Sequence, residues 1–224
     1  VYMSEVAGGA DFTAEGALVE ATGDEDNSNF WCNHKESSEG TYEGLLDNDF
    51  STYFHSSWNG DNATAENPHF LVANLKEAVS GQIEIKMAVR DQSNQAYYPT
   101  LITVYGANEF DKENPDATEW HKQGQVAVTY NLTAEGFTQR TTNNVGYAIA
   151  TLDGSYKYIR FDVDNTALNT NKFFVLSECN IWPAVGSTEQ YSPEFEEVQK
   201  SNPTAISNLL AEIKASEAQL AAGK

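Results

Sequence analysis

The feature that most constrains the fold of this chain is a series of short apolar runs separated by turn residues, which extends from residue 30 to residue 182. In several runs, such as residues 82–86, apolar and polar residues alternate, as in a strand that buries one face and exposes the other. The pattern is typical of an all-β domain. The expected strands cover residues 70–75, 81–89, 100–108, 125–131, 146–151, 156–163 and 173–182.

The pattern changes on either side of this region, which indicates three parts. Residues 1–27 are acidic and Gly-rich, and we expect a leader or interdomain segment with little regular structure. Residues 28–183 make up the β domain. In residues 184–224, apolar side chains from Ile206 to Leu220 recur at helical spacings of three, four and seven, so we expect a helical C-terminal extension. Its apolar stripe is expected to pack on the sandwich, with a following domain as the alternative.

The charge of the chain excludes some partners. The formal net charge is −20, from 33 acidic and 13 basic residues, and no cluster of Lys and Arg is present. Such a field repels the phosphate backbone of nucleic acids and anionic membrane surfaces. No run approaches the ~20 apolar residues that a membrane-spanning helix needs. The N-terminus lacks the features of a signal peptide, but a cleaved signal leaves no trace, so this observation decides nothing.

The two cysteines, Cys32 and Cys179, lie far apart in the sequence. Two cysteines make neither a disulfide framework nor a zinc site. They could form one bridge between the first and last strands of the domain. We favour two buried free thiols, because Cys packs readily as a small apolar group.

The stretch of residues 45–58 carries the most chemistry. Asp47, Asp49 and Thr52 place two carboxylates and a hydroxyl within six residues, which suits a hard cation with oxygen ligands. His55 follows, three residues before Trp58, and pairs a hydrogen-bonding imidazole with an apolar ring face. Such a pair can hold a sugar, and neither half of the stretch implies catalysis. The chain is therefore interpreted first as a binding module.

Residues 28–183 resemble the discoidin-like domains, also called coagulation factor V/VIII type C domains, and most closely the bacterial carbohydrate-binding modules of family thirty-two. The resemblance implies a jelly-roll β-sandwich with binding loops at one end. The sequence departs from the family at Asn48, where Gly is common, at Asn74, where Asp is common, and at Cys179, where an aliphatic residue is usual. Asn tolerates the left-handed conformation that a Gly would supply. The matching segments, in the order of the family, are residues 45–49 with Thr52, 53–58, 68–75, 105–108, 157–161 and 176–182.

The resemblance implies one structural calcium ion. Its side-chain ligands would be Asp47, Asp49, Thr52 and the remote Glu178, with backbone carbonyl groups from Gly44 and Ser177. An EF-hand is excluded, because Thr52 stands where the sharp-turn Gly belongs and Trp58 where the bidentate Glu belongs. The alternative is an acidic surface turn held by side-chain-to-backbone hydrogen bonds.

The resemblance also implies a shallow site for a galactose-type sugar. His55 and Trp58 would contact the ring and Arg90 its hydroxyl groups, with Asn94 as a further hydrogen-bonding partner. Phe173, or the adjacent Phe174, would supply a second ring. Aromatic faces bury the C–H side of a sugar, and Arg and His donate to hydroxyl groups in fixed directions. The alternative is that His55 and Trp58 only pack the sandwich.

The expected function is a non-catalytic carbohydrate-binding module of a larger secreted bacterial glycan-degrading protein. Its partners would be a glycan or oligosaccharide and the other domains of that protein, and its location extracellular, at the cell surface or periplasmic. A protein-adhesion domain and a non-binding spacer remain alternatives. An enzyme is not expected, since no phosphate-binding loop, nucleophile elbow or paired-His zinc motif is present.

Overall fold

The computed structural model describes residues 11–60, 62–90, 97–130, 145–168 and 173–184. The helical extension predicted for residues 184–224 lies, from residue 185 onward, outside the described residues. No helix among the described residues is long and apolar enough to cross a membrane. The strands are β1 (Phe30–Cys32), β2 (Phe54–His55), β3 (Phe70–Ala88), β4 (Pro99–Ala107), β5 (His121–Ala127), β6 (Thr129–Tyr130), β7 (Val145–Thr166), β8 (Val175–Leu176) and β9 (Glu178–Pro183), with short 3-10 turns η1 (Glu43–Leu45) and η2 (Pro115–Ala117).

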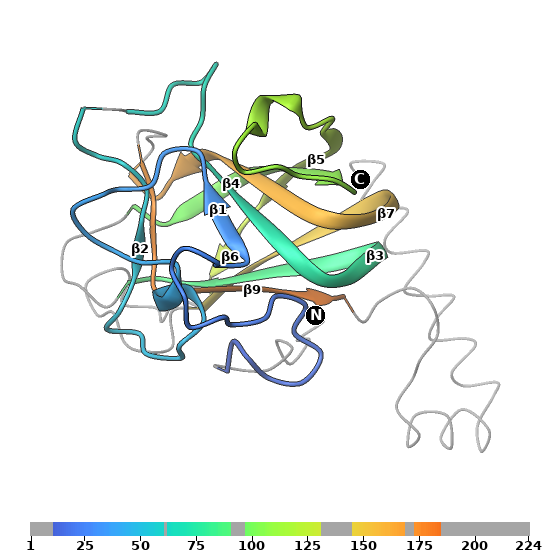
Figure 1. The fold of residues 1–224 in the computed structure, drawn as a ribbon, viewed down its shortest axis with the longest axis horizontal. Helices are drawn as coiled ribbons and strands as arrows, with labels where there is room; N and C mark the ends of the chain where they lie inside the picture. Colours follow the sequence, from blue (N-terminus) through green and yellow to red (C-terminus); the bar gives the residue numbers. More distant parts are fainter. Residues whose placement is uncertain (1–10, 61, 91–96, 131–144, 169–172, 185–224) are drawn as a thin grey trace, which may run out of the picture. The chain divides into compact units, whose positions relative to one another are not determined.

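Two long strands, β3 and β7, build both layers of a β-sandwich (Figure 1). The first half of β3 lies between β1 and the second half of β7, which in turn pairs with β4, and β5 completes this layer. The second half of β3 lies between β9 and the first half of β7, which pairs with β6. The register between the two strands shifts between Asn74 and Gly81, and Gly81 has a φ of +80°. The chain bends there and passes from one layer to the other.

This bend corrects the strand prediction. The sequence indicated separate strands at 70–75 and 81–89, and again at 146–151 and 156–163, whereas each pair forms one continuous strand. Turn-forming residues such as Ser80 and Gly81 indicate a change of direction, but they do not distinguish a bend from a reversal of the chain. The prediction of an all-β sandwich is confirmed.

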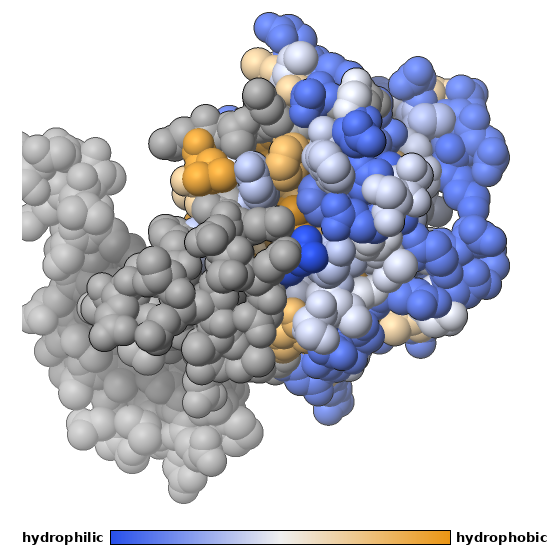
Figure 2. Space-filling model, turned by 90° about the vertical axis from the view of Figure 1, so that its left-hand side faces the viewer, coloured by the Kyte–Doolittle hydropathy of each residue, from blue (hydrophilic) through white to orange (hydrophobic). Residues whose placement is uncertain are grey.

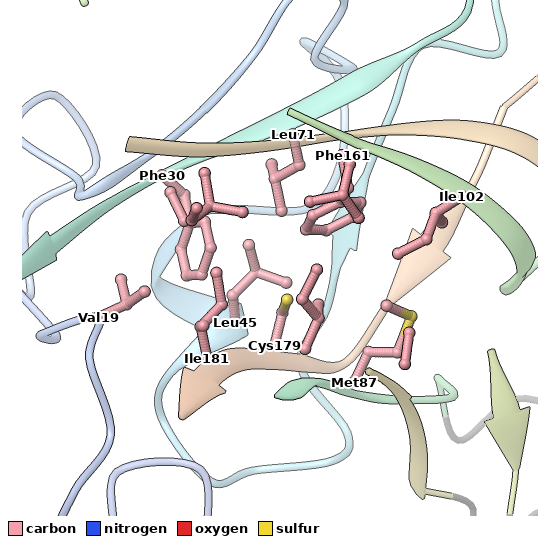
Figure 3. Packing of buried hydrophobic residues seen from close by; sticks show 14 of the residues in the cluster. Val19, Phe30, Leu45, Leu71, Met87, Ile102, Phe161, Cys179 and Ile181 are labelled. Carbon is pink, nitrogen blue, oxygen red and sulfur yellow. The ribbon is translucent and has the colours of Figure 1, made fainter. Parts of the chain in front are cut away.

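The core lies between the two layers. Side chains from both halves of β3 and β7 belong to one buried cluster. Leu71 and Phe161 of the first layer face Cys179 and Ile181 of the second in Figure 3. Burial of these apolar groups is the main favourable term in folding. Cys32 and Cys179 are both buried free thiols, as the sequence analysis favoured.

Residues 11–27 contain no helix or strand, yet they pack on the sandwich rather than leading away from it. Asn180 in β9 holds them, because its Nδ2 donates to the carbonyl groups of Phe12 (2.6 Å) and Val19 (2.9 Å) while its Oδ1 accepts from the Val19 N–H (3.0 Å). The ring of Phe12 is buried against Trp182. The predicted leader therefore covers part of the core. Its few apolar residues have no period that the sequence could reveal.

Candidate functional site

Three segments meet at the end of the sandwich that carries β2, which faces the viewer in Figure 2. Strand β2 pairs with β8, so Phe54 lies opposite Leu176 and His55 opposite Val175. The Ser177 N–H donates to the carbonyl of Ala88, at the end of β3 (3.0 Å). Residues 53–58, 88–90 and 173–177 are thereby brought together. The described surface of this end is mainly hydrophilic (Figure 2).

The carboxylate of Glu39 links three side chains at this end, two of them predicted site residues. Its Oε2 accepts a hydrogen bond from the hydroxyl of Tyr53 (2.7 Å), and its Oε1 accepts one from Nε1 of Trp58 (2.8 Å). The Nη1 of Arg90 lies 3.9 Å from Oε2. The guanidinium of Arg90 also stacks on the ring of Tyr53, 3.3 Å from its centroid. Arg90 and Trp58 are thus brought together around an acid that the sequence analysis did not identify.

Glu39 is held in place by the segment that contains it. The N–H groups of Glu36 and Thr41 donate to the carbonyl groups of His55 (3.0 Å) and Tyr53 (2.9 Å), so this segment runs alongside β2. Between them, Gly40 has a φ of +75°, and a Cβ there would lie 2.7 Å from the backbone nitrogen of His55. Only Gly allows this close approach. A Glu-Gly pair in a polar segment is a weak signal, which explains why the sequence analysis missed it.

The imidazole of His55 is buried and neutral. Burial lowers the pKa of His55 more than hydrogen bonding to Ser56 and the charge of Glu39 raise it. Its Nδ1 lies 2.6 Å from the carbonyl oxygen of Ser56, which can only accept, so Nδ1 carries the proton. The Nε2 of the neutral ring therefore holds a lone pair and accepts hydrogen bonds.

The acid at the centre of the site is ionised. Burial alone would raise the pKa of Glu39, but hydrogen bonds from Tyr53 and Trp58 and the positive charge of Arg90 outweigh it and lower the pKa. The ionised carboxylate accepts hydrogen bonds strongly. It is charged throughout the neutral range.

Three aromatic rings border these polar groups. The side chain of Trp58 is 44% exposed, which makes it one of the three exposed large hydrophobic residues in the described chain. Phe173 packs on His55, with 5.3 Å between ring centroids, and on Tyr97, with 4.2 Å. Phe173 and Tyr97 are both partly exposed. The predicted residue Asn94 lies outside the described residues, and the alternative ring, Phe174, is buried in the core.

The predicted metal ligands in residues 47–52 form a tight acidic turn. The hydroxyl of Thr52 donates to Oδ2 of Asp47 and to the carbonyl of Asp49, both at 2.7 Å. Asn48 has a φ of +58°, so it takes the left-handed conformation expected for this position. The carboxylate of Asp49 accepts from the N–H (3.0 Å) and hydroxyl (2.6 Å) of Ser51. The backbone carbonyl of Asp49 therefore accepts from Thr52, while its side-chain carboxylate accepts from Ser51.

Glu178, the remote predicted ligand, lies fully buried at the start of β9 beside this turn. Neither of its carboxylate oxygens has a hydrogen-bond partner of normal geometry among the described residues. Burial and the adjacent carboxyl of Asp47 raise the pKa of Glu178 to about 9. Gly44 is buried in η1, where a Cβ would lie 2.9 Å from the nitrogen of Tyr53, and Ser177 directly precedes Glu178.

This pocket suits a cation. A buried carboxylate without a partner is costly unless a positive charge neutralises it. Among the described residues, no three His, Cys, Asp or Glu side chains converge to form a complete metal site. A cation held here would therefore bind Asp47 and Glu178 and take its remaining ligands from hydroxyl and carbonyl oxygens, which is a donor set that calcium accepts.

No protein-family model matches this chain, and no curated protein matches it. Several solved structures are similar to it in fold. The family 32 module of NanJ from Clostridium perfringens, in complex with galactose, is 15% identical and covers 68% of this chain and 91% of its own, with a TM-score of 0.45. The module CBM32-3 from a family 31 glycoside hydrolase of the same organism is 18% identical, with coverage of 75% and 96% and a TM-score of 0.49.

A third module, CpGH89CBM32-5 from Clostridium perfringens in complex with GalNAc-β-1,3-galactose, is 11% identical, with coverage of 74% and 99% and a TM-score of 0.47. At these identities and scores the similarity assigns neither a ligand nor a site. These three solved structures are modules of family 32, the family that the sequence resembles.

Proposed function

We propose that this chain is a non-catalytic carbohydrate-binding module that binds a galactose-configured sugar weakly at Trp58, His55 and Arg90. The observation that supports this most is the exposed indole of Trp58, whose edge is fixed by Glu39 beside the guanidinium of Arg90. An exposed aromatic face next to oriented charged groups is the arrangement that a sugar requires. Its C–H face covers the ring while its hydroxyl groups bond to the polar groups.

The three polar groups have different roles in this proposal. The Nε2 lone pair of His55 and the carboxylate of Glu39 accept hydrogen bonds from sugar hydroxyl groups, and Arg90 donates to a sugar oxygen. The axial hydroxyl of galactose leaves a continuous C–H patch on one ring face, and that patch covers Trp58. Because the hydroxyl groups only exchange water for protein, the affinity should be near the millimolar range, about −4 kcal/mol.

We further propose that Asp47 and Glu178 hold one structural calcium ion together with oxygen atoms of Thr52, Asp49, Gly44 and Ser177. The support is the buried carboxylate of Glu178, whose oxygens have no hydrogen-bond partner of normal geometry among the described residues. The ion would tie the acidic turn to β9 and supply no chemistry to a reaction. The resemblance in sequence also favours an extracellular, cell-surface or periplasmic location within a larger glycan-degrading protein.

The test is titration of the isolated chain with galactose, N-acetylgalactosamine and lactose, followed by calorimetry or NMR, with glucose as the comparison sugar. Trp58→Ala should abolish measurable binding and leave the melting temperature nearly unchanged, because the indole is exposed. Trp120→Phe, at a half-buried indole on the β5 side of the molecule, is the matched control and should bind as the parent does. If no sugar binds at about 50 mM, or if Trp58→Ala binds normally, the spacer function replaces this proposal.

A further inference from the structure

A second aromatic surface lies on the outer face of the layer that contains β1. A straight row of paired positions runs across four strands, from Trp31 on β1 through Val72 and Arg160 to Tyr105 on β4. Tyr158 lies on the same face, two residues before Arg160. These side chains point away from the core, because the alternate residues of the same strands are buried in it.

The loop between β4 and β5 folds back over this face. Phe110 of that loop lies 5.3 Å from the ring of Trp31 and 5.8 Å from the ring of Tyr158, measured between centroids. Trp120 lies 5.9 Å from Phe110 on the other side. A small satellite core under a loop is the ordinary result of such packing.

The packing under this loop is incomplete, however. A hollow of about 200 Å³ remains, and its walls include the rings of Trp31, Phe110 and Tyr158. Its lining also includes Asn74 and the charged residue Lys112. The hollow is half open to solvent and combines aromatic rings with polar groups, which is the composition of a ligand site rather than of the core.

One residue that lines the hollow, Asn74, carries a buried hydrogen-bond acceptor without a partner among the described residues. Asn29 donates from Nδ2 to the carbonyl of Glu20 (2.8 Å), so its Oδ1 accepts from Nδ2 of Asn74 (3.0 Å). This chain of bonds fixes the orientation of both amides. The buried Oδ1 of Asn74 is left with no hydrogen-bond partner among the described residues. Leaving such an atom unpaired costs free energy, and a ligand with a hydroxyl donor would remove that cost.

We propose that this hollow is a second saccharide site, which binds one neutral hexopyranose unit of a glycan. The C–H face of the sugar packs on Trp31 and Tyr158, and one hydroxyl donates to Oδ1 of Asn74. The charges around the hollow balance, because its lining acids are Glu25, which pairs with Lys35 (3.1 Å), and Asp26, whose carbonyl accepts a hydrogen bond from Lys112 (2.9 Å). An uncharged ligand therefore suits it better than an anionic or cationic one.

The site is independent of the one at Trp58 and has room beside it. The two sites share no residue. The site at Trp58 lies on β2 and its loops, whereas the second site lies on the outer face of β1, β3 and β7. A larger hollow of about 610 Å³ also borders Phe110, and its lining carries amide, hydroxyl and carboxylate groups. Further units of the same glycan would extend into that space. Two sites on one module would raise avidity for a polymer without any new contact.

The experiment uses the four tryptophans as separate reporters. In ¹H–¹⁵N NMR spectra, Trp31 reports the second site, Trp58 the first, and Trp120 and Trp182 serve as references, with signals assigned by Trp→Phe variants. The probes are galactose, glucose, cellobiose and glucosamine, each up to about 50 mM, a range suited to millimolar affinity. At least one neutral probe should shift the indole signal of Trp31 and the side-chain amide of Asn74, in the parent and equally in Trp58→Ala.

Two variants complete the test. Asn74→Ala removes the acceptor and should weaken the response of Trp31 at least fivefold, whereas Trp58→Ala should leave it unchanged. The proposal is overturned if only Trp58 responds, or if Asn74→Ala responds as the parent does. A response to glucosamine alone would also overturn it, because the ligand would then be cationic. If the indole signal of Trp31 responds to sugar in the parent protein and that of Trp58 does not, the first site is refuted and the second is supported.

Discussion

Two arginines, Arg90 and Arg160, stack on aromatic rings beside a carboxylate. The two pairs differ in the distance between the guanidinium and the carboxylate. Arg160 lies 3.6 Å from the centroid of Phe70 and donates from Nε and Nη2 to both oxygens of Asp162, at 2.6 and 2.9 Å. Arg90 lies over Tyr53, but its Nη1 is 3.9 Å from Glu39, beyond hydrogen-bonding distance. Two short hydrogen bonds hold Arg160 to Asp162, whereas the longer contact between Arg90 and Glu39 is one for which a ligand can compete.

The same contrast extends to Glu178. Asp162 and Glu178 are both buried acids, at 4% and 0% exposure, but within the described part of the chain only Asp162 forms an ion pair with a basic side chain. If the contrast is correct, removal of Arg160 should mainly affect stability, and removal of Arg90 or Glu178 should mainly affect ligand binding.

The largest effect is expected for Arg160→Ala. This change leaves the buried carboxylate of Asp162 without its two hydrogen bonds and should lower the free energy of unfolding by about 3 kcal/mol. Urea unfolding followed by fluorescence measures it. Arg160→Lys keeps the charge but not the planar fork, so it should recover only part of the loss. A change in the free energy of unfolding below about 0.5 kcal/mol, within the usual range for surface substitutions, would show that the pair of Arg160 and Asp162 does not stabilise the fold.

Calcium is expected to act nearly as strongly at Glu178. An ion that binds only the folded state stabilises it by about 2.7 kcal/mol at a hundredfold excess over its dissociation constant. The melting temperature should therefore rise with added calcium and fall with chelator. In Glu178→Gln, which keeps the shape without the charge, this dependence should be lost. A parent protein indifferent to both calcium and chelator would mean that Glu178 is simply a protonated buried acid.

A smaller effect is expected for Arg90→Ala. Sugar affinity should fall about tenfold, or ~1.4 kcal/mol, because the charge-assisted donor is lost. The free energy of unfolding should change by less than 1 kcal/mol, since the pair with Glu39 is loose and partly exposed. Titration with galactose and urea unfolding of the same sample separate the two quantities. A stability loss equal to that of Arg160→Ala would remove the distinction between the two arginines.

The smallest effect is expected from pH. The pKa values of His55 and Glu39 both lie below their ordinary values, 6.5 and 4.5, so the ring is mainly neutral and the acid ionised above pH 6.5. The unfolded chain binds more protons at these groups, so their stabilising contribution is complete above the ordinary pKa and lost as pH falls through the lowered one. Galactose affinity should be equal at pH 8 and 6.5 and decline only in more acidic solution.

Glu39→Gln provides the control for this pH dependence. Because the amide does not titrate, the variant should lose the part of the acidic decline that follows protonation of Glu39. A binding midpoint at pH 6.5 in the parent would contradict the neutral state assigned to His55.

The sequence predicted those parts of the molecule that depend on local pattern. Alternation of apolar residues indicated the strands, and the spacing of His55 and Trp58 indicated the segment that the structure places beside Arg90. It did not reveal Glu39, whose position depends on the close approach of Gly40 to β2. It also placed Phe12 outside the sandwich, because a single buried ring in an irregular segment has no period. Contacts of this kind depend on tertiary structure, which one sequence does not display.

The bend in β3 and β7 has a kinetic consequence. Because each strand belongs to both layers, and because Phe70 pairs with Asp162 and Ala88 with Val145, the pairing of β3 with β7 must close a large loop of chain. The local pair of β4 and β5 supplies only the edge of one layer. Folding should therefore be slow and of high contact order, as in other β-sandwiches. A protease cut in the bend of β3, near residues 76–80, would leave β7 as the one long strand that still joins the two layers.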